Sequence, residues 1–402
     1  MISITRQTTA FAIILLLTTI LLCSVRVYIN PFDIELAESE FMPRWWSALL
    51  SGLMLFVAAI IINRTTVKIG LFGGFSALPV SIFGFFACGV LVSPNMVTAA
   101  ATALVLSFGI LFLLRSIQTV GEKESLFTGA LMLGVLPIIY PPTIVFALIL
   151  PIVMITAPLN IRQTKIITTG YLLPVLGASY LNWYLGGEIS GLAISIWEQL
   201  FAPSAIGIAD VPVVVWIIVA VTIPLLLYGI AQGIYNRYAM LVPIRKSIQI
   251  AICMFIIGIA ALLFVPGCGI TIIPAIAAPA TIIASFALDK MDSKWANWFY
   301  IAIVALVVIH LIFKSPCKYT TEADRTVSLC LCSLLIFAFF DLSFDDIECL
   351  VNCLFECSSA LLGKYISAWN VKCYKCNLIS LLIIFFTSQY YVYAGWILGK
   401  AL

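Results

Sequence analysis

Residues 248–265 read IQIAICMFIIGIAALLFV, and this run decides the fold. It carries no charge and approaches the roughly 20 residues that a helix needs to cross a hydrocarbon core about 30 Å thick. Lipid offers the backbone no hydrogen-bonding partner, so a spanning segment has to be a helix or a barrel strand. Barrel strands alternate apolar and polar residues, whereas this run is almost continuously apolar. The sequence therefore predicts a membrane-spanning helix.

Similar apolar runs recur from the N-terminus to residue 313. Of the 402 residues, 63% are apolar and 10% are charged, whereas about 25% are charged in a typical soluble domain. We expect an all-α polytopic transmembrane bundle over residues 1–313, with about eleven spanning helices, and a separate tail over residues 314–402. The expected spans are 8–23, 46–63, 75–92, 97–114, 126–140, 142–158, 166–185, 211–234, 248–265, 270–288 and 295–313.

The basic residues predict which helix ends face the cytoplasm, because short cytoplasmic loops are rich in Lys and Arg. With a cytoplasmic N-terminus, only Arg26 and Arg44 fall outside up to residue 313. The inner set is Arg6, Arg64, Lys68, Arg115, Lys123, Arg162, Lys165, Arg237, Arg245, Lys246, Lys290 and Lys294. The net charge of +3 follows from this topology and gives no reason to propose a nucleic-acid partner.

The first external loop, residues 26–44, gathers acidic side chains between two arginines. Its acidic residues are Asp33, Glu35, Glu38 and Glu40. One interpretation is that they only keep an exported loop solvated. The other is that they form, together with Arg26 and Arg44, a site at the outer membrane surface.

The longest external loop, residues 186–210, is also acidic and contains no basic residue. Within it, residues 194–201 are apolar and include Trp197. This stretch predicts a short helix that lies in the membrane interface.

The predicted helix interiors disfavour two kinds of transport. No Asp, Glu, Lys or Arg lies near the middle of a span, and proton-driven carriers normally need such groups there. Sodium held by backbone carbonyls at broken helices is not excluded by this argument. The sequence has no GxxxxGK[ST] loop for nucleotide phosphates. The sole histidine, His310, lies near a span end and is interpreted as a packed or interfacial residue.

Residues 126–188 carry a resemblance to a known family. A glycine-containing helix and a Pro-Pro turn lead to the segment Pro158-Leu159-Asn160-Ile161-Arg162 and to a helix with Gly170 and Pro174. This pattern resembles an uncharacterised family of multi-pass inner-membrane proteins of Bacteroidota, over residues 1–313. The resemblance implies a location in the bacterial envelope and brings no established activity with it. We expect a multi-pass inner-membrane protein with a role in envelope biogenesis and with membrane lipids as partners.

A second resemblance is to polytopic glycosyltransferases that use lipid-phosphate sugar donors. It rests on the acidic first external loop and on the glycine-rich segment FTGALMLG, residues 127–134. It implies a lipid-linked glycan substrate, with Asp33 or Glu35 as general base or ligand of a divalent metal. Arg26 or Arg44 would hold the phosphate, and Glu38 and Glu40 would complete the binding site. No paired Asp-Glu motif accompanies these residues.

A non-enzymatic role competes with this hypothesis. The nearly uncharged bundle also suits a lipid or glycan transporter, or a scaffold for membrane assembly. A channel is less attractive, because no ring of like charge or repeated pore motif is present.

The tail differs from the bundle in composition. It contains eight of the twelve cysteines, including Cys373 and Cys376 with CxxC spacing and Cys349, Cys353 and Cys357 on one helix face. Candidate tail helices are 327–340, 347–366 and 379–398. The cysteines could be small buried hydrophobes, external disulfides or part of an atypical extension of the chain. The residues favour none of the three decisively.

Overall fold

The computed structural model describes residues 12–17, 19–20, 44–72, 76–89, 96–118, 122–156, 160–202, 213–236 and 238–313. The chain divides into the units Met1–Pro316 and Cys317–Leu402, and every described residue belongs to the first. The predictions for the tail, including its helices and cysteines, therefore lie outside the described residues. Half of the expected first span, 8–23, and the first external loop up to residue 43 lie outside them as well.

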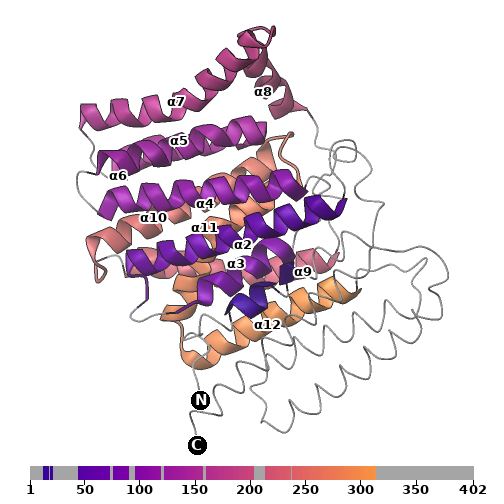
Figure 1. Cartoon of the computed structure of the whole chain (residues 1–402). Helices are drawn as coiled ribbons and strands as arrows, with labels where there is room; N and C mark the ends of the chain where they lie inside the picture. Colours follow the sequence, from indigo (N-terminus) through magenta and orange to yellow (C-terminus); the bar gives the residue numbers. More distant parts are fainter. Residues whose placement is uncertain are drawn as a thin grey trace, which may run out of the picture. The chain divides into compact units, whose positions relative to one another are not determined.

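The described residues form helices and contain no strand, which confirms the all-α class (Figure 1). The longer helices are α2 (Arg44–Ile69), α4 (Met96–Gln118), α7 (Ile161–Tyr184), α9 (Val213–Tyr235), α10 (Val242–Phe264), α11 (Ile273–Lys290) and α12 (Ser293–Phe313). The shorter elements are α3 (Leu78–Gly89), α5 (Lys123–Ile139), η2 (Pro141–Leu148), α6 (Ile149–Thr156), α8 (Gly191–Phe201) and η4 (Ile270–Ile272).

Five of these helices are long and apolar enough to cross a membrane. They are Trp46–Ile69, Val97–Gln118, Ile217–Tyr235, Val242–Phe264 and Ile273–Lys290. Three shorter apolar helices, Leu78–Ala87, Pro141–Thr156 and Ser293–Val307, do not reach that length. The expected number of about eleven spans is therefore confirmed only in part, and the larger number stays a prediction.

The Tyr140-Pro141-Pro142 turn reverses the chain after α5, as the sequence predicts. Tyr140 has an extended backbone (φ −141°, ψ 100°). The two prolines lack N–H groups, so they cannot continue the hydrogen bonding of α5 and instead begin a new element. That element starts as the 3₁₀ helix η2 and continues as α6.

Helix α11 is the centre of the bundle. Every residue from Pro274 to Leu288 is buried, and α11 contacts α3, α4, α9 and α10. Its sequence, IPAIAAPATIIASFALDK, is rich in alanine, and small side chains let neighbouring helix backbones approach closely where lipid gives no hydrophobic force for association.

Glycines bring several helix pairs into close contact. A Cβ added to Gly134 of α5 would clash with the carbonyl oxygen of Tyr171 in α7, and one added to Gly170 would lie 2.8 Å from the carbonyl oxygen of Phe127. In α9, Gly229 faces Ile283 of α11 and Gly233 faces Ile248 of α10. Gly229 and Gly233 have the GxxxG spacing that is common where membrane helices dimerise, and here both glycines pack against helices of the same chain.

Helix α7 lies at the edge of a row of helices. In Figure 1, α7, α5, α4 and α2 follow one another in that order, and each contacts the next. Besides α5, α7 contacts α8. Only Ile167 and Gly170 of α7 are buried.

Short connections fix the direction of each helix, so the bundle has two distinct ends. We call the end with the α4–α5 connection the Arg115 end, and the end with the α5–η2 turn and α8 the Tyr140 end. The basic residues predicted to be cytoplasmic lie at the Arg115 end wherever the structure describes them. They are Arg64, Lys68, Arg115, Lys123, Arg162, Lys165, Arg245, Lys246, Lys290 and Lys294.

Candidate functional site

The site residues predicted from the sequence fall on the first external loop. Arg26, Asp33, Glu35, Glu38 and Glu40 lie outside the described residues. Arg44 is the first residue of α2, but its side chain is not among those described. The proposed catalytic and phosphate-binding roles therefore stay predictions.

At the Tyr140 end, one tyrosine hydroxyl connects segments that are far apart in the sequence. Tyr140 Oη donates a hydrogen bond to the carbonyl oxygen of Gly267 (2.8 Å) and accepts one from the backbone N–H of Gly269 (3.1 Å). Residues 265–269 form the turn between α10 and η4. This hydroxyl thus joins the tip of the α5–η2 hairpin to the tip of the α10–α11 hairpin.

The same turn holds the end of α8. The backbone N–H of Gly267 donates to the carbonyl oxygen of Leu200 at 3.1 Å. A Cβ on Gly267 would clash with the carbonyl oxygen of Gln199, so only glycine allows this approach. We call Tyr140, Leu200, Gly267 and Gly269 the Tyr140 junction.

The side chains around the junction are neutral and poorly suited to acid–base chemistry. Burial raises the pKa of Tyr140 above its ordinary value of 10.0, although its hydrogen bond with Gly269 partly opposes this. Burial also raises the pKa of the Cys268 thiol to about 12. Because the thiolate is the nucleophilic form, this shift lowers the reactivity of Cys268 at neutral pH. The hydrogen bonds of the Tyr140 junction therefore serve to hold three segments of the chain together.

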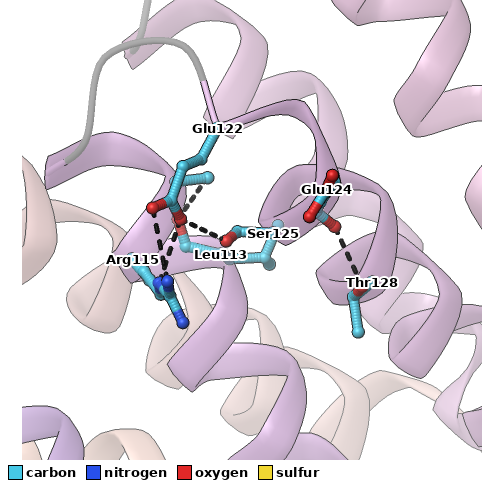
Figure 2. Close-up of polar contacts among 7 residues, drawn as sticks. Leu113, Arg115, Glu122, Glu124, Ser125 and Thr128 are labelled. Carbon is cyan, nitrogen blue, oxygen red and sulfur yellow. Dashed lines mark hydrogen bonds and ion pairs between the residues drawn. The ribbon is translucent and has the colours of Figure 1, made fainter.

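At the Arg115 end, a polar cluster joins α4 to α5. Figure 2 shows Arg115 and Ser125 converging on the carboxylate of Glu122. Arg115 Nε lies 2.9 Å from Glu122 Oε2, and Ser125 Oγ donates to the same oxygen at 2.6 Å. Glu122 precedes the first turn of α5, where the helix dipole favours negative charge, and Arg115 lies in the last turn of α4, where it favours positive charge. This cluster therefore links the C-terminal end of α4 to the N-terminal end of α5.

The interior between these ends is uncharged. The buried polar side chains in the described part of the chain are serines and threonines. Most of them donate to a carbonyl three or four residues earlier, as Ser107 does to Ala103 (2.7 Å) and Thr281 to Ala277 (2.6 Å). Such bonds satisfy the hydroxyl within its own helix, so these side chains do not define a polar path across the bundle.

Potential metal ligands are scattered rather than grouped in the described ranges. No three His, Cys, Asp or Glu side chains there lie close enough together to hold a metal ion. A divalent metal bound by Asp33 or Glu35 concerns the first external loop, which those ranges do not include.

The exposed tryptophans mark both ends of the bundle. Where their side chains are described, they lie in the first two turns or the last turn of a long helix, or on α8: Trp46, Trp183, Trp197, Trp295 and Trp298. Tryptophan is enriched where a membrane protein meets the water–lipid boundary. Trp46, Trp183 and Trp197 lie at the Tyr140 end, and Trp295 and Trp298 lie at the Arg115 end. This is the arrangement expected of two interfacial belts of tryptophan.

Sequence reasoning found the Tyr140 turn and the helix at residues 194–201, but not their connection. The signal available was the pair Gly267 and Gly269 in a turn between two apolar runs, which indicates close backbone approach without naming the partner. No family model, curated protein or solved structure matches the chain.

Proposed function

We propose that this chain is a multi-pass protein of the bacterial inner membrane, with its N-terminus and the Arg115 end in the cytoplasm. It acts in envelope biogenesis and handles a lipid-linked glycan or a lipid at the outer face of the membrane. The Tyr140 end is then the outer end.

The separation of charge between the two ends is the observation that carries this proposal. Ten basic residues of the described ranges lie at the Arg115 end, while α8 and its preceding connection at the other end contribute Glu188 and Glu198 and no basic residue. The positive-inside rule relates such a difference to orientation. Because the described interior holds no buried charge, chemistry on a polar head group is restricted to the ends.

The outer end is the better suited of the two to an amphiphilic substrate. There α7 ends in exposed aromatic residues, and α8 adds an apolar surface beside them. The first external loop leads into α2 at this same end. Its carboxylates would lie within reach of a phosphate-linked head group, with Asp33 or Glu35 as base or metal ligand and Arg26 or Arg44 on the phosphate.

One observation favours the alternative, a non-enzymatic lipid or glycan transporter or an assembly scaffold. The polar groups of the Tyr140 junction are neutral, and burial raises the pKa of the neighbouring Cys268 thiol. Within the described residues, no acid–base pair stands beside α8. If the first external loop only solvates its end of the bundle, the protein would move or organise lipids without catalysing a reaction.

The deciding experiment replaces the loop carboxylates one at a time. Asp33→Asn, Glu35→Gln, Glu38→Gln and Glu40→Gln are produced at matched membrane levels in a strain that lacks the native protein, and its lipid-linked and surface glycans are quantified. Glu188→Gln is the matched control, because Glu188 is an exposed carboxylate at the same end. Loss of a glycan in the Asp33 or Glu35 variant alone would support the hypothesis of an enzyme. Full function in all four variants would rule that hypothesis out and leave a transporter or a scaffold.

A further inference from the structure

Helix α8 has one face packed against the protein and one face free. Ile196 is buried, and α8 contacts η2 and α7. On the free face Ile194, Trp197 and Phe201 are 49%, 64% and 55% exposed. Their spacing of three and four residues puts them on one side of the helix. We call these three residues the α8 stripe.

The aromatic rings of the stripe pack against each other. The rings of Trp197 and Phe201 pack edge to face, with centroids 4.9 Å apart. In the last turns of α7, which α8 contacts, Tyr180, Trp183 and Tyr184 are exposed as well. An apolar surface shared by a long helix and a short one beside its end is the surface that the boundary of a bilayer would cover.

Two attachments fix α8 to the ends of the spanning helices. At its C-terminal end, Gly267 donates to Leu200 and excludes any side chain at position 267. Before its N-terminal end, Asn182 Nδ2 donates to the carbonyl oxygen of Glu188 at 2.8 Å. Gly186 makes the intervening turn with φ of +93°, which non-glycine residues rarely adopt. The depth of α8 is therefore tied to the depth at which α7 ends and the α10–α11 turn lies.

We propose that α8 lies in the outer leaflet at head-group level, with the α8 stripe inserted among the acyl chains of uncharged or zwitterionic lipids. An interfacial helix that binds anionic lipid carries Lys or Arg on its polar face. Residues 184–202 contain none, and their charged side chains are Glu188 and Glu198. Insertion therefore depends on apolar and aromatic burial and is independent of salt. This inference rests on the membrane orientation proposed above and not on any catalytic or transport activity.

The test measures the depth of Trp197 in proteoliposomes of the whole chain. The emission of Trp197 is the difference between the spectra of wild type and Trp197→Phe. We expect this difference emission to lose most of its intensity in lipids brominated near the head group and little to aqueous iodide. It should not change when anionic lipid or salt is added.

The matched control is Trp298→Phe, which reports a tryptophan in the second turn of α12, at the Arg115 end. Quenching of Trp298 by brominated lipid together with quenching of Trp197 by iodide would overturn the insertion of α8 while leaving the membrane protein intact. Iodide quenching of both would instead contradict the membrane placement itself. Lipid quenching of Trp197 that disappears as the protein-to-lipid ratio rises would assign the stripe to contact between copies and overturn the proposal.

A second variant tests the attachment. In Gly267→Ala the added Cβ displaces α8, so the lipid quenching of Trp197 should change while that of Trp298 stays constant. Identical Trp197 quenching in Gly267→Ala and wild type would overturn the claim that this turn sets the depth of α8.

Discussion

Helices α11 and α7 are both long helices of the same bundle, but their surroundings are opposite. Residues 274–288 of α11 are buried without exception, whereas α7 has two buried residues among 24. Of the five helices suited to spanning, α11 has the lowest mean hydropathy and the largest buried share, 83%. Hydropathy therefore does not identify the central helix of this bundle.

The physical reason is that lipid is as apolar as a leucine side chain, so burial against protein brings no hydrophobic gain inside a membrane. Close packing of small side chains decides which helix is central, and α11 is built from alanine, proline, serine and threonine among its isoleucines. Helix α7 carries larger residues such as Leu172, Leu173 and Leu176 on its exposed side. The four predictions below test this difference between centre and edge.

The largest effect is expected from enlarging a small residue of α11. Ala284 is fully buried, so Ala284→Leu adds volume where neighbouring helices leave no room, at a cost of about 3 kcal/mol. The control is Ala178→Leu on α7, a position of intermediate burial, with an expected change of less than about 0.5 kcal/mol. Unfolding by SDS titration in mixed micelles, followed by circular dichroism, measures both. Equal destabilisation would show that α11 is no more tightly packed than α7.

The second-largest loss of stability is expected where α7 packs closely against α5. Gly134→Ala would push a methyl group against the backbone of Tyr171 in α7, and a backbone cannot rotate away, so we expect a loss of about 2 kcal/mol. Gly177→Ala is the matched change on α7 itself, because a Cβ there meets nothing within 4 Å. Its helix propensity should make that variant more stable by about 0.5–1 kcal/mol. The same unfolding measurement compares the two variants. If both substitutions changed the free energy of unfolding in the same direction, the close backbone contact between α5 and α7 would be contradicted.

The helical class, the Tyr140 turn and the helix at residues 194–201 could be predicted from the sequence, because each follows from neighbouring residues. The central place of α11 could not, since the pattern of its own residues does not show what surrounds it. Nor could the bond between Tyr140 and Gly267, which are 127 residues apart. The roles of Asp33 and Glu35 rest on a resemblance carried by the acidic first external loop, and the described structure does not include these residues.

A smaller effect is expected where the edge of the bundle is tied to its centre. Tyr140→Phe keeps the ring but leaves the carbonyl of Gly267 and the N–H of Gly269 without their partner. We expect a loss of about 1 kcal/mol. Tyr180→Phe is the control on α7, since its ring is 60% exposed and its hydroxyl can bond to water or head groups. A Tyr140→Phe protein as stable as wild type would show that the hydroxyl does not contribute to joining the two hairpins.

The smallest effect is expected at the Arg115 end. The ion pair between Arg115 and Glu122 is 2.9 Å long, but its side chains are 45% and 36% exposed. Water and salt screen such pairs, so Arg115→Ala should cost about 0.5 kcal/mol or less and should cost less still at high salt. Arg162→Ala is the control at the exposed start of α7, with no expected change. A loss from Arg115→Ala that exceeds that from Tyr140→Phe would reverse the order argued here. It would mean that charged contacts at the Arg115 end, rather than small-residue packing around α11, dominate the stability of the bundle.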